Sequence, residues 1–500
     1  MKENEKVQST YGLKPVKVLP VVPPAPVNDQ DDEDEEKDLE QFKTADNLRL
    51  PFREELFPTI FRENLLTSPR NRKVPIMLSL FAPLGAIDCR IRMQYPFDRK
   101  RKHACHLQVV FEAPPGTGKA CFADVAEQII GPTLEAHDEE QRRIEQEYRE
   151  KKNARTQNEK IGLVPKTTIR CIPPSTSNTV IVRRSDYYKR IHGDYLTFWM
   201  FAEELALLSD AGKMGYSNLR TIMRIAYDIG AKFGQDFASD NSYSAITDVQ
   251  MCAMFCGTPT DVDEVFNTSE IAGGGCSRVI LCTLEDQIGA KPAHFESFTP
   301  EQEQSINVML KLLMKQTYDE DDRLKPVINL DMSWLFDDIE RWTQKQCRRV
   351  KDMQTRGKVG YRAIDTFRKR ASVNAFRCTG LLYHMYHLDN EMHGKELHTE
   401  EEIRSLCRKM YRFMSEFCLN SAVNRWGQQY EEYYHKRALG SKPDRRKPLL
   451  EQLTKEFTRA QLCELIERNN MDSEARFFLS RWKSKGWIEK TDKNVYRKLV

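Results

Sequence analysis

The segment that most clearly predicts chemistry is residues 113–120, which read APPGTGKA. Gly116 and Gly118 permit backbone angles that turn successive amides inward, and amides at the start of a helix attract phosphate oxygens. Lys119 adds an ammonium group that can reach the β- and γ-phosphates of a nucleoside triphosphate. The segment therefore predicts a phosphate-binding loop, and the residues expected to hold ATP are Gly116, Thr117, Gly118, Lys119 and Ala120.

Two positions depart from the usual loop pattern G-x-x-x-x-G-K-[ST]. Ala113 replaces the first glycine, which is a mild change. Ala120 replaces the serine or threonine whose hydroxyl ligates Mg²⁺, and alanine cannot ligate a metal ion. The pattern thus predicts nucleotide binding more firmly than efficient hydrolysis. The alternative interpretation is an ordinary glycine turn between a strand and a helix.

A pair of acids follows a second apolar run, residues 196–202. In a nucleoside triphosphatase the first acid, here Glu203, holds Mg²⁺ directly or through water, and the second, Glu204, polarises the attacking water. The first acid is usually aspartate. The extra methylene of Glu203 moves its carboxylate by about one bond length, a shift that would partly compensate for Ala120. The alternative is an acidic helix N-terminus favoured by the helix dipole.

Two further residues complete the predicted catalytic set. Thr258 follows the apolar run 249–256, where a polar side chain can sense the γ-phosphate; the alternative is a simple turn. Arg278 follows the flexible run Gly273–Gly275 and suits an arginine finger that acts on a neighbouring subunit. This role predicts a homo-oligomer, and the alternative is a surface arginine beside a loop. Arg370 and Arg377, on a later helix, are weaker candidates for sensing nucleotide.

The elements that must position these residues belong to an α/β fold. A short apolar run at 107–111, the glycine loop and a helix-like stretch at 121–130 open a parallel α/β unit. Near-continuous apolar runs are typical of parallel strands buried on both faces. Such runs recur at 168–172, 196–202, 249–256 and 279–282. Helices with apolar faces are expected before them, at 53–66 and 74–87.

Length and charge divide the chain of 500 residues into several parts. Residues 1–47 carry a net charge of −6 and are expected to be a disordered acidic tail. The predicted ATPase core is 48–296, interrupted near 133–165 by a charged, solvated helical insertion. Residues 297–440 are expected to form a helical domain, because their apolar positions keep helical spacing.

The thirteen cysteines include no C-x-x-C pair, which is typical of free thiols in a reducing compartment. The longest apolar stretch, 74–87, is too short to span a bilayer, and the N-terminus has no apolar signal region. We therefore expect a cytoplasmic protein with no membrane segment.

Residues 441–500 predict a winged helix-turn-helix. Two short helices, at 449–457 and 460–468, precede a third whose buried stripe is Ala475, Phe478, Leu479 and Trp482, and a small hairpin follows. Residues 476–500 carry a net charge of +6, which favours binding to the phosphates of DNA. The predicted DNA contacts are Arg476, Ser480 and Lys483 on the third helix, with Lys490 and Lys493 on the hairpin. The alternative is a winged helix used for protein contacts.

From about Leu50 to Gly380 the chain resembles an uncharacterised family of primase/helicase-associated P-loop ATPases carried on bacterial mobile elements and phages. The pieces that carry the resemblance are LPFREELFP, APLGAIDCRIRMQYP, APPGTGKA, FAEEL, CGTPTDVDEVF, GGGCSRVILC and FRKRASVNAFR. The resemblance implies a RecA/AAA+-like core that serves replication or mobilisation of such elements, with a separate primase or other replication proteins as partners. It implies the roles given above for Lys119, Glu203, Glu204, Thr258 and Arg278.

The patterns, together with what the resemblance implies about a mobile element, lead to two expected functions. The first is a DNA-associated ATPase of a mobile genetic element, helicase-like or acting in replication initiation, with ATP and Mg²⁺ as cofactors. The second is a DNA-binding regulator that binds ATP with little or no turnover, which Ala120 favours. A purely structural partner of a replisome would bind neither nucleotide nor DNA.

Overall fold

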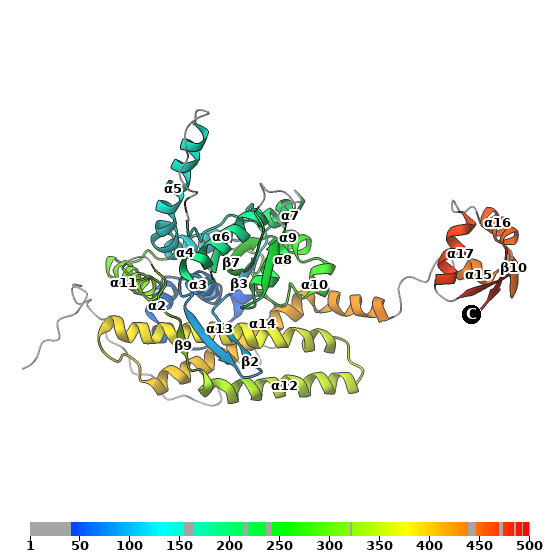
Figure 1. The fold of residues 1–500 in the computed structure, drawn as a ribbon. Coiled ribbons are helices and arrows are strands. Elements are labelled where there is room, and N and C mark those ends of the chain that lie inside the picture. The colour runs from blue at the N-terminus through cyan, green and yellow to red at the C-terminus, as the bar shows by residue number, and fades with distance from the viewer. Residues whose placement is uncertain are drawn as a thin grey trace, which may run out of the picture. The chain divides into compact units, whose positions relative to one another are not determined.

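The computed structural model describes residues 42–154, 165, 167–195, 197–213, 219–236, 243–320, 323–438, 447–469, 474–484, 487–492 and 494–499. The chain forms two compact units, the first ending at Glu431 and the second beginning at Glu432 (Figure 1). Among the described helices, none combines the length and apolar character needed to cross a bilayer. The protein is a mixed α/β chain.

The centre of the first unit is a parallel sheet of four strands in the order β4-β7-β3-β8. These strands are β4 (Thr197–Ala202), β7 (Gln250–Gly257), β3 (Gln108–Glu112) and β8 (Ile280–Thr283). Every residue of β3 and β7 is buried, because both strands are nearly continuous apolar runs covered on both faces. The predicted parallel strands at 107–111, 196–202, 249–256 and 279–282 are therefore confirmed.

The run at 168–172, expected to be a further strand, makes only one parallel bridge, between Cys171 and Trp199. Asp138 explains why it extends no further. Its carboxylate accepts the backbone amides of Arg170 and Cys171, at 2.8 and 2.6 Å. The prediction of a full strand here is wrong, because the Asp138 carboxylate takes backbone amides that a regular strand would use in its own ladder.

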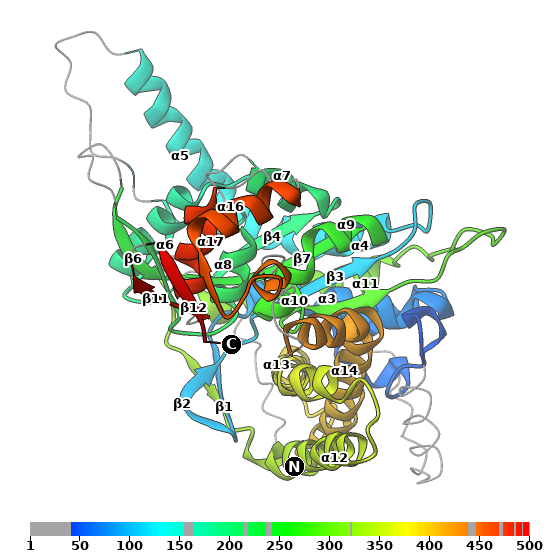
Figure 2. The same ribbon diagram turned by 90° about the vertical axis from the view of Figure 1, so that its right-hand side faces the viewer.

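Helices surround the sheet, and both α3 and α8 pack against β7 (Figure 2). The helices of this layer are α3 (Lys73–Ile87), α4 (Ala120–Ile130), α6 (Asn178–His192), α7 (Ala206–Lys213), α8 (Leu219–Ala226), α9 (Pro259–Val265) and α10 (Thr268–Gly273). The predicted helices at 74–87 and 121–130 are confirmed as α3 and α4. They place residues 113–119 as a loop between β3 and α4.

The predicted helix at 53–66 is shorter than expected. A 3-10 turn, η2 (Glu54–Leu56), precedes α2 (Thr59–Leu66), and Pro58 at the boundary is extended. Proline disfavours the α conformation in the residue before it, so one helix cannot run through this position. Nearer the N-terminus, η1 (Ala45–Asn47) buries Ala45 and Asp46, although the acidic tail was expected to reach residue 47. Residues 1–41 of that tail lie outside the described residues.

The charged insertion contains α5 (Ala136–Asn153), a solvated helix as predicted, and residues 155–164 lie outside the described ranges. On α5, Arg143 pairs with Glu140 and Glu147 one turn away on either side. A π-helical turn, η4 (Gly131–Glu135), joins α5 to α4. Figure 1 shows α5 projecting from the helices around the sheet.

The segment after the sheet is mainly helical, as predicted. Its helices are α11 (Pro300–Thr317), α12 (Phe336–Thr355), α13 (Tyr361–His393) and α14 (Glu400–Ala438). Two small sheets were not expected. One, in the order β2-β1-β9, joins β1 (Ile91–Tyr95), β2 (Asp98–His103) and β9 (Ile328–Leu330); the other is the hairpin of β5 (Lys232–Gln235) and β6 (Ala245–Asp248).

The second unit packs three short helices on a three-stranded antiparallel sheet in the order β10-β12-β11. Its elements are α15 (Lys447–Glu451), β10 (Glu456–Thr458), α16 (Arg459–Arg468), α17 (Ala475–Ser484), β11 (Ile488–Asp492) and β12 (Val495–Lys498). The buried stripe predicted on the third helix is confirmed, with Trp482 and Phe478 fully buried. The predicted helix at 449–457 is too long, since residues 456–458 pair with β12 instead.

Candidate functional site

A cavity of about 460 Å³ lies where β4 and β7 end and α4 begins. It gathers five of the residues predicted from sequence, namely Lys119, Ala120, Glu203, Glu204 and Thr258. Pro115, Ala206, Cys256, Gly257 and Asp261 complete the lining. The inserted strand β7 brings these segments together, because it pairs with β3 on one side and β4 on the other. One cation and several acids therefore face the same space.

The loop between β3 and α4 has the conformation that its glycines predict. Gly116 and Gly118 have φ of +79° and +76°, values that residues with a side chain rarely adopt. Thr117 between them is buried, and its hydroxyl donates to Pro114 O at 2.8 Å. These three residues shape the loop but do not line the cavity.

Lys119 is the cation of the cavity. Its Nζ donates to the carbonyl oxygen of Ala113 at 2.9 Å, so the ammonium group bridges the end and the start of the loop. Arg72 braces the loop from the protein interior, where Nη2 donates to Thr117 O at 2.9 Å. The other end of the Arg72 guanidinium forms a buried ion pair with Asp46. Sequence reasoning missed both Arg72 and Asp46, because neither has a local motif.

The two thiols near Ala120 do not replace the metal-ligating hydroxyl that this residue lacks. The next side chain, Cys121, donates its thiol to Gly118 O at 3.3 Å. Burial raises the pKa of Cys121 to about 12, and burial likewise raises the pKa of Cys256, in the cavity wall, to about 12. Both thiols are therefore neutral at ordinary pH and are poor ligands for Mg²⁺.

Glu203 and Glu204 are exposed side chains at the end of β4. The amide of Leu205, the next residue, donates to Cys256 O at 2.7 Å and fixes the two acids beside the end of β7. Neither acid forms an ion pair with another described residue. Mg²⁺ typically takes one or two carboxylates, and phosphate oxygens and waters complete its shell. The donor set of Glu203 and Glu204 fits that requirement.

Thr258 lines the cavity, but its hydroxyl is also part of a helix cap. It donates to Asp261 Oδ2 at 2.9 Å and accepts the amide of Asp261 at 3.3 Å, which forms a capping box at the start of α9. Asp261 is a cavity acid that sequence reasoning missed. The T-x-x-D spacing was the available signal, since it is the capping-box pattern.

Arg278 lies outside this cavity. Its Nη1 donates to Gly274 O at 2.9 Å, and its guanidinium lies 5.8 Å from the ring centre of Tyr227. Burial lowers the pKa of Arg278. Arg370 lies against the same ring and forms an ion pair with Asp228 at 3.2 Å. The role of Arg278 toward a neighbouring subunit stays a prediction.

Arg377, the other weak candidate for sensing nucleotide, is 1% exposed. Its Nη1 donates to His106 O at 2.9 Å, and its guanidinium stacks on Tyr227 at 4.0 Å from the ring centre. Neither Arg370 nor Arg377 lines the cavity of Lys119. A structural role for Arg377 follows from its contacts.

The residues predicted to contact DNA are exposed where they are described. Arg476, Ser480 and Lys483 lie on the solvent side of α17, and Lys490 lies on β11, whereas Lys493 is outside the described residues. The same side of α17 exposes Phe477 and Arg481, which sequence reasoning missed. The guanidinium of Arg476 lies 4.9 Å from the ring centre of Phe477 and pairs with Glu474 at 2.7 Å.

Comparison of the sequence with protein-family models finds no matching family, and comparison with curated proteins finds no match. Within the described ranges, no group of three or more histidine, cysteine, aspartate or glutamate side chains is arranged to hold a metal ion by itself. The cavity geometry therefore carries the functional argument.

Proposed function

We propose that this chain is a DNA-associated ATPase of a mobile genetic element, which binds ATP with Mg²⁺ in the cavity of Lys119. The observation that carries the proposal is that Lys119, Glu203, Glu204 and Thr258 line one cavity beside a glycine loop in the required left-handed conformation. An isolated glycine turn would need no cation and no acid pair at the same place.

Each residue has a role set by its chemistry. Lys119, with the amides at the start of α4, would hold the phosphates, and Glu203 would hold Mg²⁺. Glu204 orients and polarises the attacking water, and Thr258 contacts the γ-phosphate. The bound metal ion supplies neutralisation of the charge that develops on the phosphate oxygens.

The core proposed for this activity is RecA/AAA+-like. Its support is the parallel sheet with β7 between the loop strand β3 and the acid strand β4. Arg278 lies outside the cavity of its own chain, which is the arrangement needed if it completes the site of a neighbour in a homo-oligomer.

The second unit is proposed to bind DNA as a winged helix. Its order of elements, helix, strand, two helices and a hairpin, supports this, as do the exposed cations of α17 and β11. Primase or other replication proteins of the same element are further proposed partners, which the sequence resemblance alone supports.

A second function is favoured by one specific observation. Ala120 lacks the metal-ligating hydroxyl, and the neighbouring thiols are neutral. A chain that holds ATP but turns it over slowly would act as a nucleotide-dependent DNA-binding regulator.

The two functions are separated by phosphate release measured with and without single-stranded DNA. We expect DNA-stimulated release by the wild type, loss of release and of ATP binding in Lys119→Ala, and loss of release with retained binding in Glu204→Gln. Ala120→Ser should increase release. Tight ATP binding without release in the wild type would favour the regulator, and the absence of ATP binding would overturn both.

A further inference from the structure

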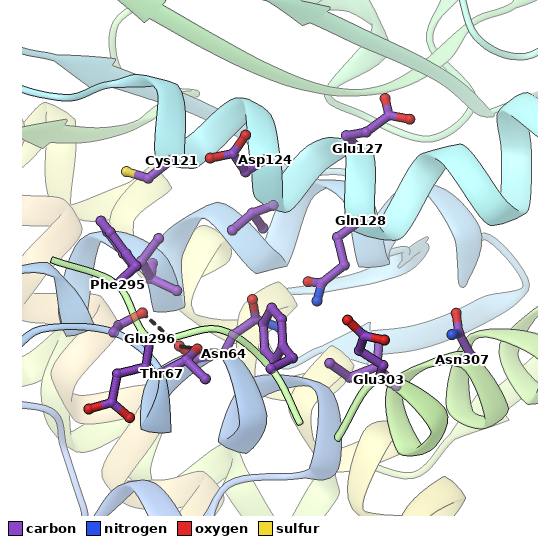
Figure 3. A pocket seen from close by; sticks show the side chains of 15 residues that line it. Asn64, Thr67, Cys121, Asp124, Glu127, Gln128, Phe295, Glu296, Glu303 and Asn307 are labelled. Carbon is purple, nitrogen blue, oxygen red and sulfur yellow. Dashed lines mark hydrogen bonds between the residues drawn. The ribbon is translucent and has the colours of Figure 1, made fainter. Parts of the chain in front are cut away.

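A second cavity, of about 570 Å³, starts at the residue that follows Ala120. Cys121 and the outer side of α4 form one wall, and the end of α2, the segment 295–298 and the start of α11 form the other (Figure 3). Its volume is within the range of small-molecule pockets. Since Ala120 lines the first cavity and Cys121 the second, both cavities border the first turn of α4.

The walls of this second cavity suit a flat ring. Val125 on α4, Ile306 on α11 and Ile76 on α3 contribute aliphatic side chains to its lining. Two half-buried aromatic side chains, Phe295 and Phe298, come from the segment that follows β8. Aromatic faces bind nucleobases by stacking, whatever the base.

Two amide side chains, Gln128 and Asn64, present hydrogen-bond acceptors to the cavity. Gln128 points from α4 into the space (Figure 3), and its Oε1 is buried without a hydrogen-bond partner among the described residues. Asn64, on the opposite wall, donates its amide nitrogen to Ile60 O at 2.9 Å, so its oxygen is the group that it offers. A ligand seated here must supply N–H donors, because an unpaired buried acceptor costs free energy.

The charge of the cavity excludes phosphate. Its lining includes four acids and no lysine, arginine or histidine, and none of the acids forms an ion pair with a described residue: Asp124, Glu127, Glu296 and Glu303. Phosphates would be repelled here and attracted to Lys119 in the first cavity. A nucleotide that spans both cavities would therefore bind in one orientation, with its phosphates in the first cavity and its base in the second.

We propose that the second cavity holds the adenine and ribose of the nucleotide whose phosphates Lys119 binds, an inference that rests on the proposed function. The exocyclic amine of adenine donates to Gln128 Oε1, and the ring stacks between the phenylalanines and the aliphatic wall. Ribose hydroxyls donate to rim carboxylates such as Asp124. Guanine has the acceptor O6 in place of the exocyclic amine, so in this amide orientation it would leave the buried Gln128 Oε1 without a donor, and the cavity selects adenine.

The test is equilibrium binding of the full chain to three probes with Mg²⁺: ATP, GTP and inorganic tripolyphosphate. We expect the wild type to bind ATP about tenfold more tightly than either other probe, which corresponds to about 1.4 kcal/mol. Asn307→Trp fills the cavity from α11 and should reduce the affinity for ATP to that for tripolyphosphate, which should not change. Gln304→Trp, on an exposed position of α11 outside the lining, is the matched control and should change neither.

Gln128→Leu separates binding from folding. Because Gln128 Oε1 has no protein partner among the described residues, this variant should keep the melting temperature of the wild type and lose the preference for ATP over GTP. Unchanged ATP affinity in Asn307→Trp, or equal wild-type affinity for ATP and tripolyphosphate, would overturn the adenine cavity and leave the phosphate site intact. Failure of all three probes to bind would overturn the phosphate site and the adenine cavity together.

Discussion

Arg425 donates Nε to both carboxylate oxygens of Glu112, at 2.8 and 3.0 Å. Glu112 is the last residue of β3, and its side chain is 3% exposed. Through Nη2, the same guanidinium donates to Asp263 at 2.8 Å and to Pro259 O at 3.3 Å. A single arginine of α14 thus ties the end of the loop strand to α9, whose cap borders the cavity.

Removing one partner of the Arg425–Glu112 pair should lower the free energy of unfolding more than removing both partners. Arg425→Met leaves the Glu112 carboxylate buried without its cation, and we expect a loss of about 3 kcal/mol in the free energy of unfolding. The double variant with Glu112→Gln should recover part of that loss, since no buried charge is left. Urea unfolding measures both. Arg143→Met, which removes an exposed ion pair of α5, should have no measurable effect.

The loop glycines should be required for nucleotide binding through their backbone angles alone. A Cβ at Gly118 would meet no atom within 4 Å, so the cost of Gly118→Ala arises from φ of +76° and is about 1 kcal/mol. We expect ATP affinity to fall because the loop adopts another conformation. Gly394→Ala is matched in φ, +59°, and in open space, and it should cost similar stability without changing ATP affinity. Equal ATP affinity in both variants would contradict the loop's role.

The stability of the first unit should depend on pH through His103. Burial, with the charge of Arg377 adding to it, lowers the pKa of His103 to about 3. In the unfolded chain this pKa is about 6.5, so the stability that neutral His103 contributes above that pH is lost as the pH falls. We expect a loss of up to about 1.4 kcal/mol per pH unit between pH 6 and pH 4.

Urea unfolding at several pH values measures this dependence. His103→Gln should reduce the slope, and the exposed His294→Gln serves as the control. An equal slope in His103→Gln and the wild type would show that other groups cause the acid sensitivity.

Asp389 should make the first unit less stable as the pH rises, which is the opposite of the effect of His103. Burial raises the pKa of Asp389 to about 6, although its Oδ2 accepts the amide of Thr59 at 2.7 Å. Because this folded-state pKa lies above the unfolded value of about 3.9, the favourable contribution present below pH 4 is lost as the pH rises to 6. Asp389→Asn should therefore raise the free energy of unfolding by about 3 kcal/mol at pH 7.5 and give no gain at pH 3.5. A loss at both pH values would mean that the carboxylate itself is needed.

Binding of DNA by the second unit should respond to individual charges. Replacing Arg476, Lys483 and Lys490 by Gln should weaken binding and reduce the salt slope by about 0.9 for each phosphate that is no longer neutralised. Arg497→Gln is the control, since Arg497 pairs with Glu456 and Glu489 inside the unit. Fluorescence anisotropy at several salt concentrations gives the slope. If Arg497→Gln changes the salt slope as much as the triple variant does, the DNA-binding surface lies elsewhere.

Removal of residues 445–500 should weaken DNA binding more than any of these substitutions.

The features that the sequence predicts best are those that depend on a continuous run of neighbouring residues. The apolar run that becomes β7 is buried on both faces over its whole length, so its pattern alone indicates a central strand. Lys119, Glu203 and Thr258 are found for a similar reason, because each follows a buried strand and parallel strands end at one edge of the sheet.

The features that could not be predicted from the sequence depend on contacts between residues that are far apart along the chain. Arg72 and Arg170 resemble surface residues by type, yet they are 1% and 0% exposed, and their partners lie in other elements. β9 consists of only three residues, and it pairs with β1, which lies more than two hundred residues earlier in the sequence. The second cavity was missed because its walls come from four helices and the segment 295–298, which are separate in the sequence.

Asp138 has a consequence for the behaviour of the chain in concentrated solution. An edge strand with free amides is a template on which other chains can pair and aggregate. Beside β4, the short stretch at 170–172 pairs with Trp199, and the carboxylate of Asp138 accepts the amides of Arg170 and Cys171, so neither amide is left for another strand. One acidic side chain on a charged helix thereby blocks strand addition at the edge of the sheet beside β4.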